Sequence, residues 1–74
     1  MSRQLDAKGL VCPLPVLRAA RLLRGMTAGD LLEVEATDPA SARDFPAFCA
    51  QAGHRLLAAE VDGEVYRFRI EKTG

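Results

Sequence analysis

The sequence has no net charge, no long apolar run and few cysteines. Ten Lys and Arg residues balance ten Asp and Glu residues. A protein that binds nucleic acid by neutralising phosphates normally carries a basic surplus, so we expect no direct nucleic-acid partner. The apolar runs are too short to span a membrane, and no apolar segment typical of a signal peptide follows residues 1–4. We therefore expect a cytoplasmic protein without a membrane partner.

The small number of cysteine and histidine residues argues against two further classes of protein, disulfide-stapled domains and zinc-binding domains. The chain contains only Cys12, Cys49 and one histidine, His54. Disulfide-stapled domains of this size usually carry about four cysteines or more. A structural zinc site needs a full tetrahedral set of ligands, commonly with paired spacing such as C-x-x-C, which is not found here. We expect two free thiols in a reducing compartment, no metal and no organic cofactor.

The length also limits the fold. A chain of 74 residues and 8.0 kDa is too short for a barrel, a kinase or a dinucleotide fold with a substrate domain. Hydrophobic residues make up 49% and charged residues 27%, which is typical of a folded globular domain. We predict a single, monomeric domain over residues 1–74 that is too small to enclose a substrate and is not a stand-alone enzyme.

The hydrophobic periodicity predicts the element order β-α-β-α-β-β. Alternating segments predict strands over residues 3–7, 31–36, 54–60 and 64–71. Apolar residues at three- and four-residue intervals predict helices over residues 13–24 and 41–51. In the first helix this apolar set is Val16, Leu17, Ala20 and Leu23, and in the second it is Phe45, Phe48, Cys49 and Ala52. Asp62-Gly63 predicts a hairpin between the last two strands.

The start of the second helix stays open between two positions. Ser41 and Asp44 fit the S-x-x-D capping pattern. A start at Ser41 would however place Pro46 beyond the first turn, where it removes one backbone hydrogen bond. A start nearer Asp44 would avoid that loss.

The charges indicate how the strands are arranged. Right-handed β-α-β crossovers place both helices on one face of the sheet, which gives an α/β two-layer sandwich. The open face should then carry the alternating charged residues of the second and fourth strands. Unlike charges on neighbouring strands stabilise a sheet, so we expect these two strands to be adjacent. The residues concerned are Glu33, Glu35, Arg67 and Arg69.

Cys12 is the candidate reactive residue. It directly precedes the first predicted helix, and Pro13 and Pro15 fall in the first turn, where proline is well tolerated. A thiol at the positive end of a helix, beside unpaired N–H groups, is expected to be exposed and to have a lowered pKa. The alternative is that Cys12 is a small buried apolar residue. The flanking prolines favour the reactive interpretation.

Cys12-Pro13-Leu14-Pro15 resembles the CPxP signature of the TusA (SirA-like) sulfur-carrier family. The resemblance continues, in order and with matching spacing, through residues 5–10, 29–30, 37–40, 43–49, 62–63 and 66–68. It implies that Cys12 accepts a persulfide sulfur, usually from a cysteine desulfurase, and relays it to an acceptor protein. Family members serve tRNA 2-thiouridine formation, molybdenum-cofactor enzymes or sulfur oxidation. The resemblance also implies a mixed four-stranded sheet whose fourth strand lies antiparallel between the second and third.

The resemblance gives supporting roles to three further residues. Pro13 and Pro15 would hold the start of the helix, and Asp38 would lie near the same end of the sheet as Cys12. Three arginines at three-residue intervals in the first predicted helix have two interpretations. They form either a solvated helix face or a docking stripe for an acidic donor or acceptor protein. The three arginines are Arg18, Arg21 and Arg24.

The second thiol and the histidine each have two interpretations. Cys49 lies at helical spacing with Phe45, which favours a buried core thiol over a resolving cysteine that pairs with Cys12. His54 follows Gly53 and is expected to be a surface strand residue rather than a base.

Two alternatives to the sulfur-carrier function remain. One is a regulatory or interaction module that does not use the thiol, and the other is a thiol-disulfide redox protein that uses both cysteines.

Overall fold

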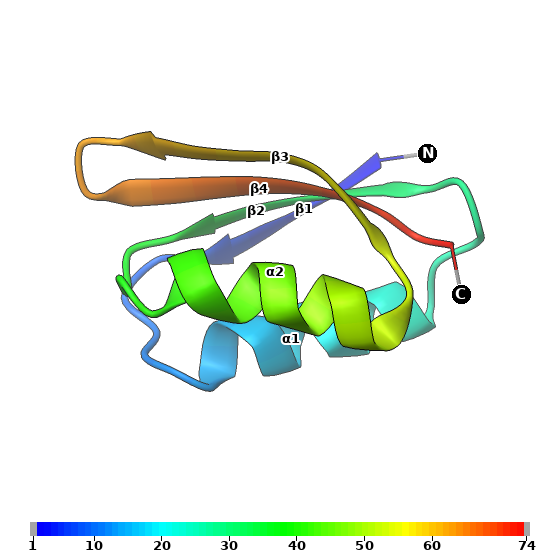
Figure 1. Cartoon of the computed structure of the whole chain (residues 1–74), viewed down its shortest axis with the longest axis horizontal. Coiled ribbons are helices and arrows are strands. Elements are labelled where there is room, and N and C mark those ends of the chain that lie inside the picture. The colour runs from blue at the N-terminus through cyan, green and yellow to red at the C-terminus, as the bar shows by residue number, and fades with distance from the viewer. Residues whose placement is uncertain (1, 74) are drawn as a thin grey trace.

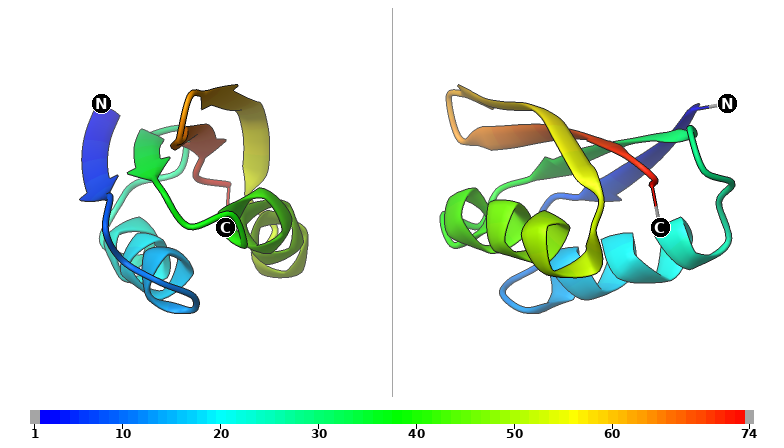
Figure 2. Two further views of the ribbon diagram at one scale, coloured as in Figure 1. Left: turned by 90° about the vertical axis from the view of Figure 1, so that its left-hand side faces the viewer. Right: turned by 45° about the vertical axis from the view of Figure 1, so that its right-hand side comes forward.

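The strands and helices follow one another in the predicted order. The computed structural model describes residues 2–73. Its elements are β1 (Ser2–Ala7), α1 (Leu14–Arg24), β2 (Leu31–Ala36), α2 (Ser41–Ala52), β3 (Arg55–Asp62) and β4 (Val65–Glu71). The helices lie side by side against one face of the sheet (Figure 1 and Figure 2), which confirms the two-layer α/β sandwich.

The sheet has the predicted mixed topology. Its strand order is β1-β2-β4-β3, with β1 parallel to β2 and with β4 antiparallel to both of its neighbours. The register of β2 against β4 places Glu33 opposite Arg69 and Glu35 opposite Arg67. The inference from unlike charges is therefore confirmed at the level of individual cross-strand pairs.

The core lies between the sheet and the two helices. Phe45 of α2 is fully buried, and its ring stacks on Phe68 of β4 with centroids 4.6 Å apart. Leu23 of α1 is also buried, at 1% exposure. Two residues of the predicted apolar faces are exposed rather than buried, namely Leu17, at 55% exposure, and Ala52. The buried set is Ala7, Ala19, Leu23, Met26, Leu32, Val34, Ala36, Phe45, Cys49, Phe68 and Ile70.

Helix α2 begins at Ser41, so Pro46 lies inside the helix. Of the two starts left open by the sequence, the one at Ser41 is confirmed and the one nearer Asp44 is wrong; the S-x-x-D pattern forms no cap, because the N-cap position is Ala40 and no side chain caps it. Ser41 is instead buried, at 2% exposure, and donates its backbone N–H to the Asp38 carbonyl at 2.9 Å. Backbone hydrogen bonds to the preceding loop thus stabilise a start that leaves Pro46 in an unfavourable interior position.

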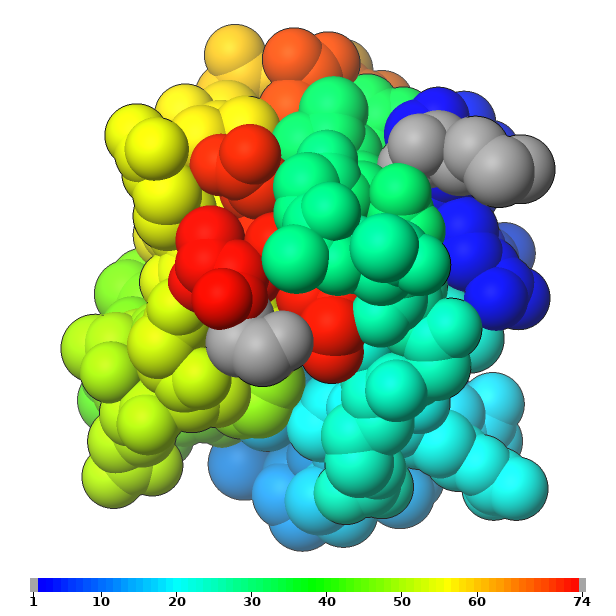
Figure 3. All heavy atoms as spheres, turned by 90° about the vertical axis from the view of Figure 1, so that its right-hand side faces the viewer, coloured from blue at the N-terminus to red at the C-terminus, as the bar shows by residue number. Residues whose placement is uncertain are grey.

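The residues after β4 connect the elements at the end of the sheet where β1 begins. Lys72 exchanges backbone hydrogen bonds with Gly29 and Asp30, and its Nζ donates to the Leu23 carbonyl at the end of α1 at 2.7 Å. Thr73 donates through its Oγ1 to the Gly53 carbonyl. Figure 3 shows this segment between the α1–β2 connection and the α2–β3 connection. Over residues 2–73, no helix is long and apolar enough to cross a membrane.

Candidate functional site

Cys12 lies in the loop between β1 and α1, at the end of the sheet that also carries the β3–β4 hairpin (Figure 1). The loop is attached to the residues that follow β2, since Gly9 donates its N–H to Thr37 Oγ1 at 3.0 Å. Gly9 has a φ of 83°, a left-handed conformation that glycine adopts without strain. The Cys12 thiol is exposed, as predicted.

Asp38 connects this loop to the start of α2. Its Oδ2 accepts the backbone N–H of Cys12 at 2.5 Å, and its Oδ1 accepts the backbone N–H of Ala40 at 3.2 Å. One carboxylate thereby fixes the backbone of the cysteine relative to the first turn of the second helix. The structure thus places Asp38 at the same end of the sheet as Cys12, where the sequence predicted it.

The start of α1 offers the thiol few free N–H groups. Pro13 is the N-cap and Pro15 lies in the first turn, and proline has no N–H. Leu14 has an N–H, but it donates to the Val11 carbonyl at 2.9 Å. Among the first three residues of α1, only Val16 therefore keeps an N–H that no backbone carbonyl occupies, fewer donors than were expected to stabilise a thiolate here.

Asp44 in the first turn of α2 raises the pKa of the Cys12 thiol above its ordinary value, because its carboxylate accepts a hydrogen bond from the thiol. Partial loss of solvent around the thiol and the negative charges of Asp44 and Asp38 also raise its pKa, while Arg43 opposes them. The predicted lowering of the thiol pKa is therefore wrong. The same hydrogen bond lowers the pKa of Asp44, as does Arg43, whose Nε lies 3.2 Å from Asp44 Oδ1.

Asp44 was not identified as a site residue from the sequence. It was considered only as part of a helix cap, although it belongs to the family-like run 43–49 and lies in the first turn of a helix that starts at the end of the sheet where Cys12 lies. Its place in that first turn was the available signal.

The exposed side of α1 combines the arginine stripe with apolar residues. Leu14 and Leu17 are 41% and 55% exposed, and Val11 in the preceding loop is 64% exposed. The three arginines are exposed, and within residues 2–73 none of them forms an ion pair. Spacing of three and four places the helical members on one side. We call this surface the α1 face: Val11, Leu14, Leu17, Arg18, Arg21 and Arg24.

The other two candidate residues lie away from the exposed thiol. Cys49 is 3% exposed and packs in the core, as predicted, and burial raises the pKa of its thiol. Both cysteines are free. His54 is half-buried beside the C-terminal segment rather than on the surface, and its Nδ1 accepts the Thr73 N–H at 3.3 Å. Burial lowers the pKa of His54.

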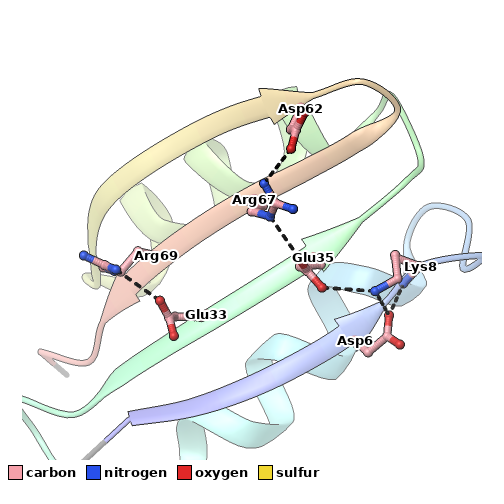
Figure 4. A network of polar contacts seen from close by, with 7 residues as sticks. All are labelled: Asp6, Lys8, Glu33, Glu35, Asp62, Arg67 and Arg69. Carbon is pink, nitrogen blue, oxygen red and sulfur yellow. Dashed lines mark hydrogen bonds and ion pairs between the residues drawn. The ribbon is translucent and has the colours of Figure 1, made fainter.

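The open face of the sheet carries a network of ion pairs (Figure 4). Part of this network lines a hollow of about 440 Å³. Glu35 lies at its centre and pairs with Arg67 at 2.9 Å and with Lys8 at 3.0 Å. Arg69 pairs with Glu33 at 3.1 Å. Four acidic residues and two arginines line the hollow, so the ion pairs neutralise its charge only in part and leave an acidic surplus. In the described part of the chain, no cluster of His, Cys, Asp and Glu could hold a metal ion.

Residues 3–72 match the family described as sulfurtransferase TusA. The chain belongs to the TusA family. The sulfur carrier protein TusA of Allochromatium vinosum is 46% identical over 71 residues, which cover 96% of this chain and 93% of that protein. A solved SirA-like protein from Desulfitobacterium hafniense superposes with a TM-score of 0.83 at 28% identity, and the match covers 100% of both chains.

Family membership confirms the resemblance found in the sequence and its expected fold. The TusA match spans both ends of the candidate site, since it includes the Cys12 loop and the first turn of α2. In this TusA-family chain the exposed thiol, Asp38 and Asp44 therefore all belong to the matched region. The helix that follows the Cys12 loop, α1, carries most of the α1 face.

Proposed function

We propose that this chain is a single-domain sulfur carrier that accepts a persulfide sulfur on Cys12 and relays it to an acceptor protein. The observation that carries the proposal is the contrast between the two thiols. Cys12 is exposed on a loop fixed by Asp38, whereas Cys49 is buried in the core. Only Cys12 can meet the sulfur of another protein without unfolding. We place the carrier in the cytoplasm, where free thiols stay reduced.

The chemistry requires only thiol exchange. A cysteine desulfurase offers a persulfide on its own cysteine, and the Cys12 thiolate attacks the terminal sulfur. A new S–S bond forms on Cys12, the S–S bond of the donor breaks, and the donor cysteine leaves as a thiolate. The acceptor cysteine then repeats the exchange on the Cys12 persulfide. The oxidation level of the transferred sulfur is conserved, so no external oxidant or reductant takes part.

The α1 face is the surface that we propose for docking. It adjoins Cys12, and its arginines have no ion-pair partner among the described residues. A donor or acceptor with an apolar patch bordered by carboxylates would complement it. Such complementarity mainly raises the association rate and orients the partner. We propose a sulfur-relay protein of tRNA thiolation or a molybdenum-cofactor enzyme system as the acceptor.

The experiment that tests the function is sulfur loading followed by mass spectrometry. The carrier is incubated with a cysteine desulfurase and cysteine, and then with and without a reducing agent. We expect the mass of one added sulfur atom, located on Cys12 and removed by reduction. The Cys49→Ala variant should load normally and Cys12→Ser should not. Equal loading of Cys12→Ser would refute the proposal, and rescue of a carrier-deletion strain by Cys12→Ser would favour a regulatory module.

A further inference from the structure

We propose that a groove beside the Cys12 loop is a specificity site, which binds a Lys or Arg side chain from the partner segment that carries the partner's cysteine. The inference rests on the proposed function of Cys12 as the sulfur-bearing residue. The groove has a volume of about 290 Å³ and lies between the β3–β4 hairpin and the connection from β2 to α2. We call it the hairpin groove: Thr37, Pro39, Gly63, Glu64 and Tyr66.

The hairpin groove is joined to the loop that carries the thiol. Thr37 and Pro39, which line the groove, are the chain neighbours of Asp38, and Asp38 Oδ2 accepts the Cys12 N–H at 2.5 Å. Thr37 Oγ1 also accepts the N–H of Gly9, from the same loop, at 3.0 Å. The hairpin, the β2–α2 connection and the β1–α1 loop lie at one end of the molecule (Figure 1). When a partner places its cysteine at Cys12, the neighbouring residues of that cysteine are therefore close to the groove.

The charge of the hairpin is unbalanced. The hairpin carries the carboxylates of Glu60, Asp62 and Glu64. Within residues 2–73, only Asp62 of these three forms an ion pair, with Arg67 at 3.1 Å. Arg67 is shared with Glu35, at 2.9 Å. Glu64 is exposed and lines the groove, so it offers an uncompensated carboxylate to a cation of the partner.

The remaining lining suits a long basic side chain. Tyr66 is half-buried against the core and Pro39 is exposed, so both give the groove apolar surface. Lys and Arg lay their methylene stems along apolar surface and keep the charged group in water, here next to the Glu64 carboxylate. Gly63, with a φ of 63°, forms a two-residue turn together with Glu64, which fixes the backbone at this position.

The groove and the α1 face together define the polarity of the partner. The α1 face requires carboxylates from the partner, whereas the hairpin groove requires a cation. A partner with acidic groups opposite α1 and a basic residue near its cysteine therefore binds in one orientation. A partner with only acidic groups around its cysteine is disfavoured by Glu64, so the groove adds a repulsive element to the choice of partner.

The test uses short cysteine peptides as probes, without a desulfurase and without sulfur. Each peptide carries Lys, Gln or Leu on one side of its cysteine, separated from it by one glycine, and both sides are tried. The peptide is added as its disulfide, together with 2-mercaptoethanol, at neutral pH. The Cys12 thiolate attacks this disulfide, one peptide leaves as a thiolate, and the mixed disulfide that forms is quantified by intact mass. Because the exchange is at equilibrium, its yield reports how well the carrier holds each peptide.

We expect the mixed disulfide of the Lys peptide to be favoured over that of the Gln peptide by about two- to five-fold at low salt, the range of an exposed ion pair. The preference should decrease at high salt. Glu64→Gln should abolish it, and Glu64→Lys should reverse it. The matched control, Glu60→Gln, removes a carboxylate of the same hairpin outside the groove and should keep the preference. Cys12→Ser should form no mixed disulfide.

Three results would overturn the proposal. The first is an equal yield of the Lys and Gln peptides on both sides of the cysteine. The second is a preference that Glu64→Gln keeps, or that Glu60→Gln loses to the same extent. The third is a Leu peptide that exceeds the Lys peptide, since the occupant would then be apolar. Failure of sulfur loading on wild-type Cys12 would instead refute the carrier function, while the peptide preference still decides on the groove.

Discussion

Removing the Asp38 carboxylate should loosen both the thiol loop and the start of α2. Asp38→Ala deletes two hydrogen bonds, from the Cys12 N–H and the Ala40 N–H. Bonds to a charged acceptor are strong, but the Cys12 donor is accessible to water, so we assign about 1 kcal/mol to each. The expected loss of unfolding free energy is about 2 kcal/mol, which corresponds to roughly 8–16 °C in Tm for a domain of this size.

The assay is urea unfolding followed by circular dichroism, combined with the initial rate of sulfur loading. Asp38→Asn keeps one carbonyl oxygen that can still accept a hydrogen bond. Its loss of unfolding free energy should therefore be about half of that of Asp38→Ala, about 1 kcal/mol. Asp62→Asn is the control, since its carboxylate is exposed and makes one ion pair with Arg67. We expect little change in that variant. A stability of Asp38→Ala equal to that of Asp62→Asn, with equal loading rates, would refute the role assigned to Asp38.

The other predictions concern docking, pH and packing. Arg18→Glu combined with Arg21→Glu should slow sulfur loading several-fold at low salt, with a smaller effect at high salt and an unchanged rate of Cys12 alkylation. The pKa of folded His54 lies below its ordinary value of 6.5, so the unfolded chain binds the proton first. Stability should therefore fall as the pH drops below 6.5, and His54→Gln should flatten this slope in urea titrations. Phe45→Ala removes a fully buried stacked ring and should cost about 3–5 kcal/mol in the same unfolding assay, and a loss below 1 kcal/mol would contradict the packing.

The topology of the sheet was predictable because two independent patterns agree in the sequence. Alternation fixes which residues share a face, and the unlike charges on that face indicate which strands are neighbours. The observed pairs Glu33–Arg69 and Glu35–Arg67 satisfy both patterns at once. Family resemblance added the position of the remaining strand. Both patterns can be recognised in the sequence without knowledge of the three-dimensional contacts. A single sequence was therefore sufficient to predict that β2 and β4 are neighbours.

The errors have a common physical origin in contacts between distant residues. Leucines lie on both sides of α1, so helical spacing alone did not show that Leu17 faces solvent. The start of α2 depends on backbone bonds to Asp38 rather than on its own capping residue. The thiol pKa depends on Asp44, which is remote in the sequence from Cys12. Local rules describe a helix end in isolation and miss the carboxylate that a neighbouring helix brings to it.

The first and last described residues lie at the same end of the sheet, which has a practical consequence for joining this domain to others. Ser2 begins β1 and Thr73 follows β4 at the end of the sheet opposite the Cys12 loop (Figure 1). A domain fused through either end would leave the thiol, the start of α2 and the β3–β4 hairpin uncovered. A short flexible tether to a sulfur donor would raise the local concentration of the carrier to the millimolar range without altering its reactive end. The arrangement of the chain thus suits covalent fusion to an enzyme as well as free diffusion between enzymes.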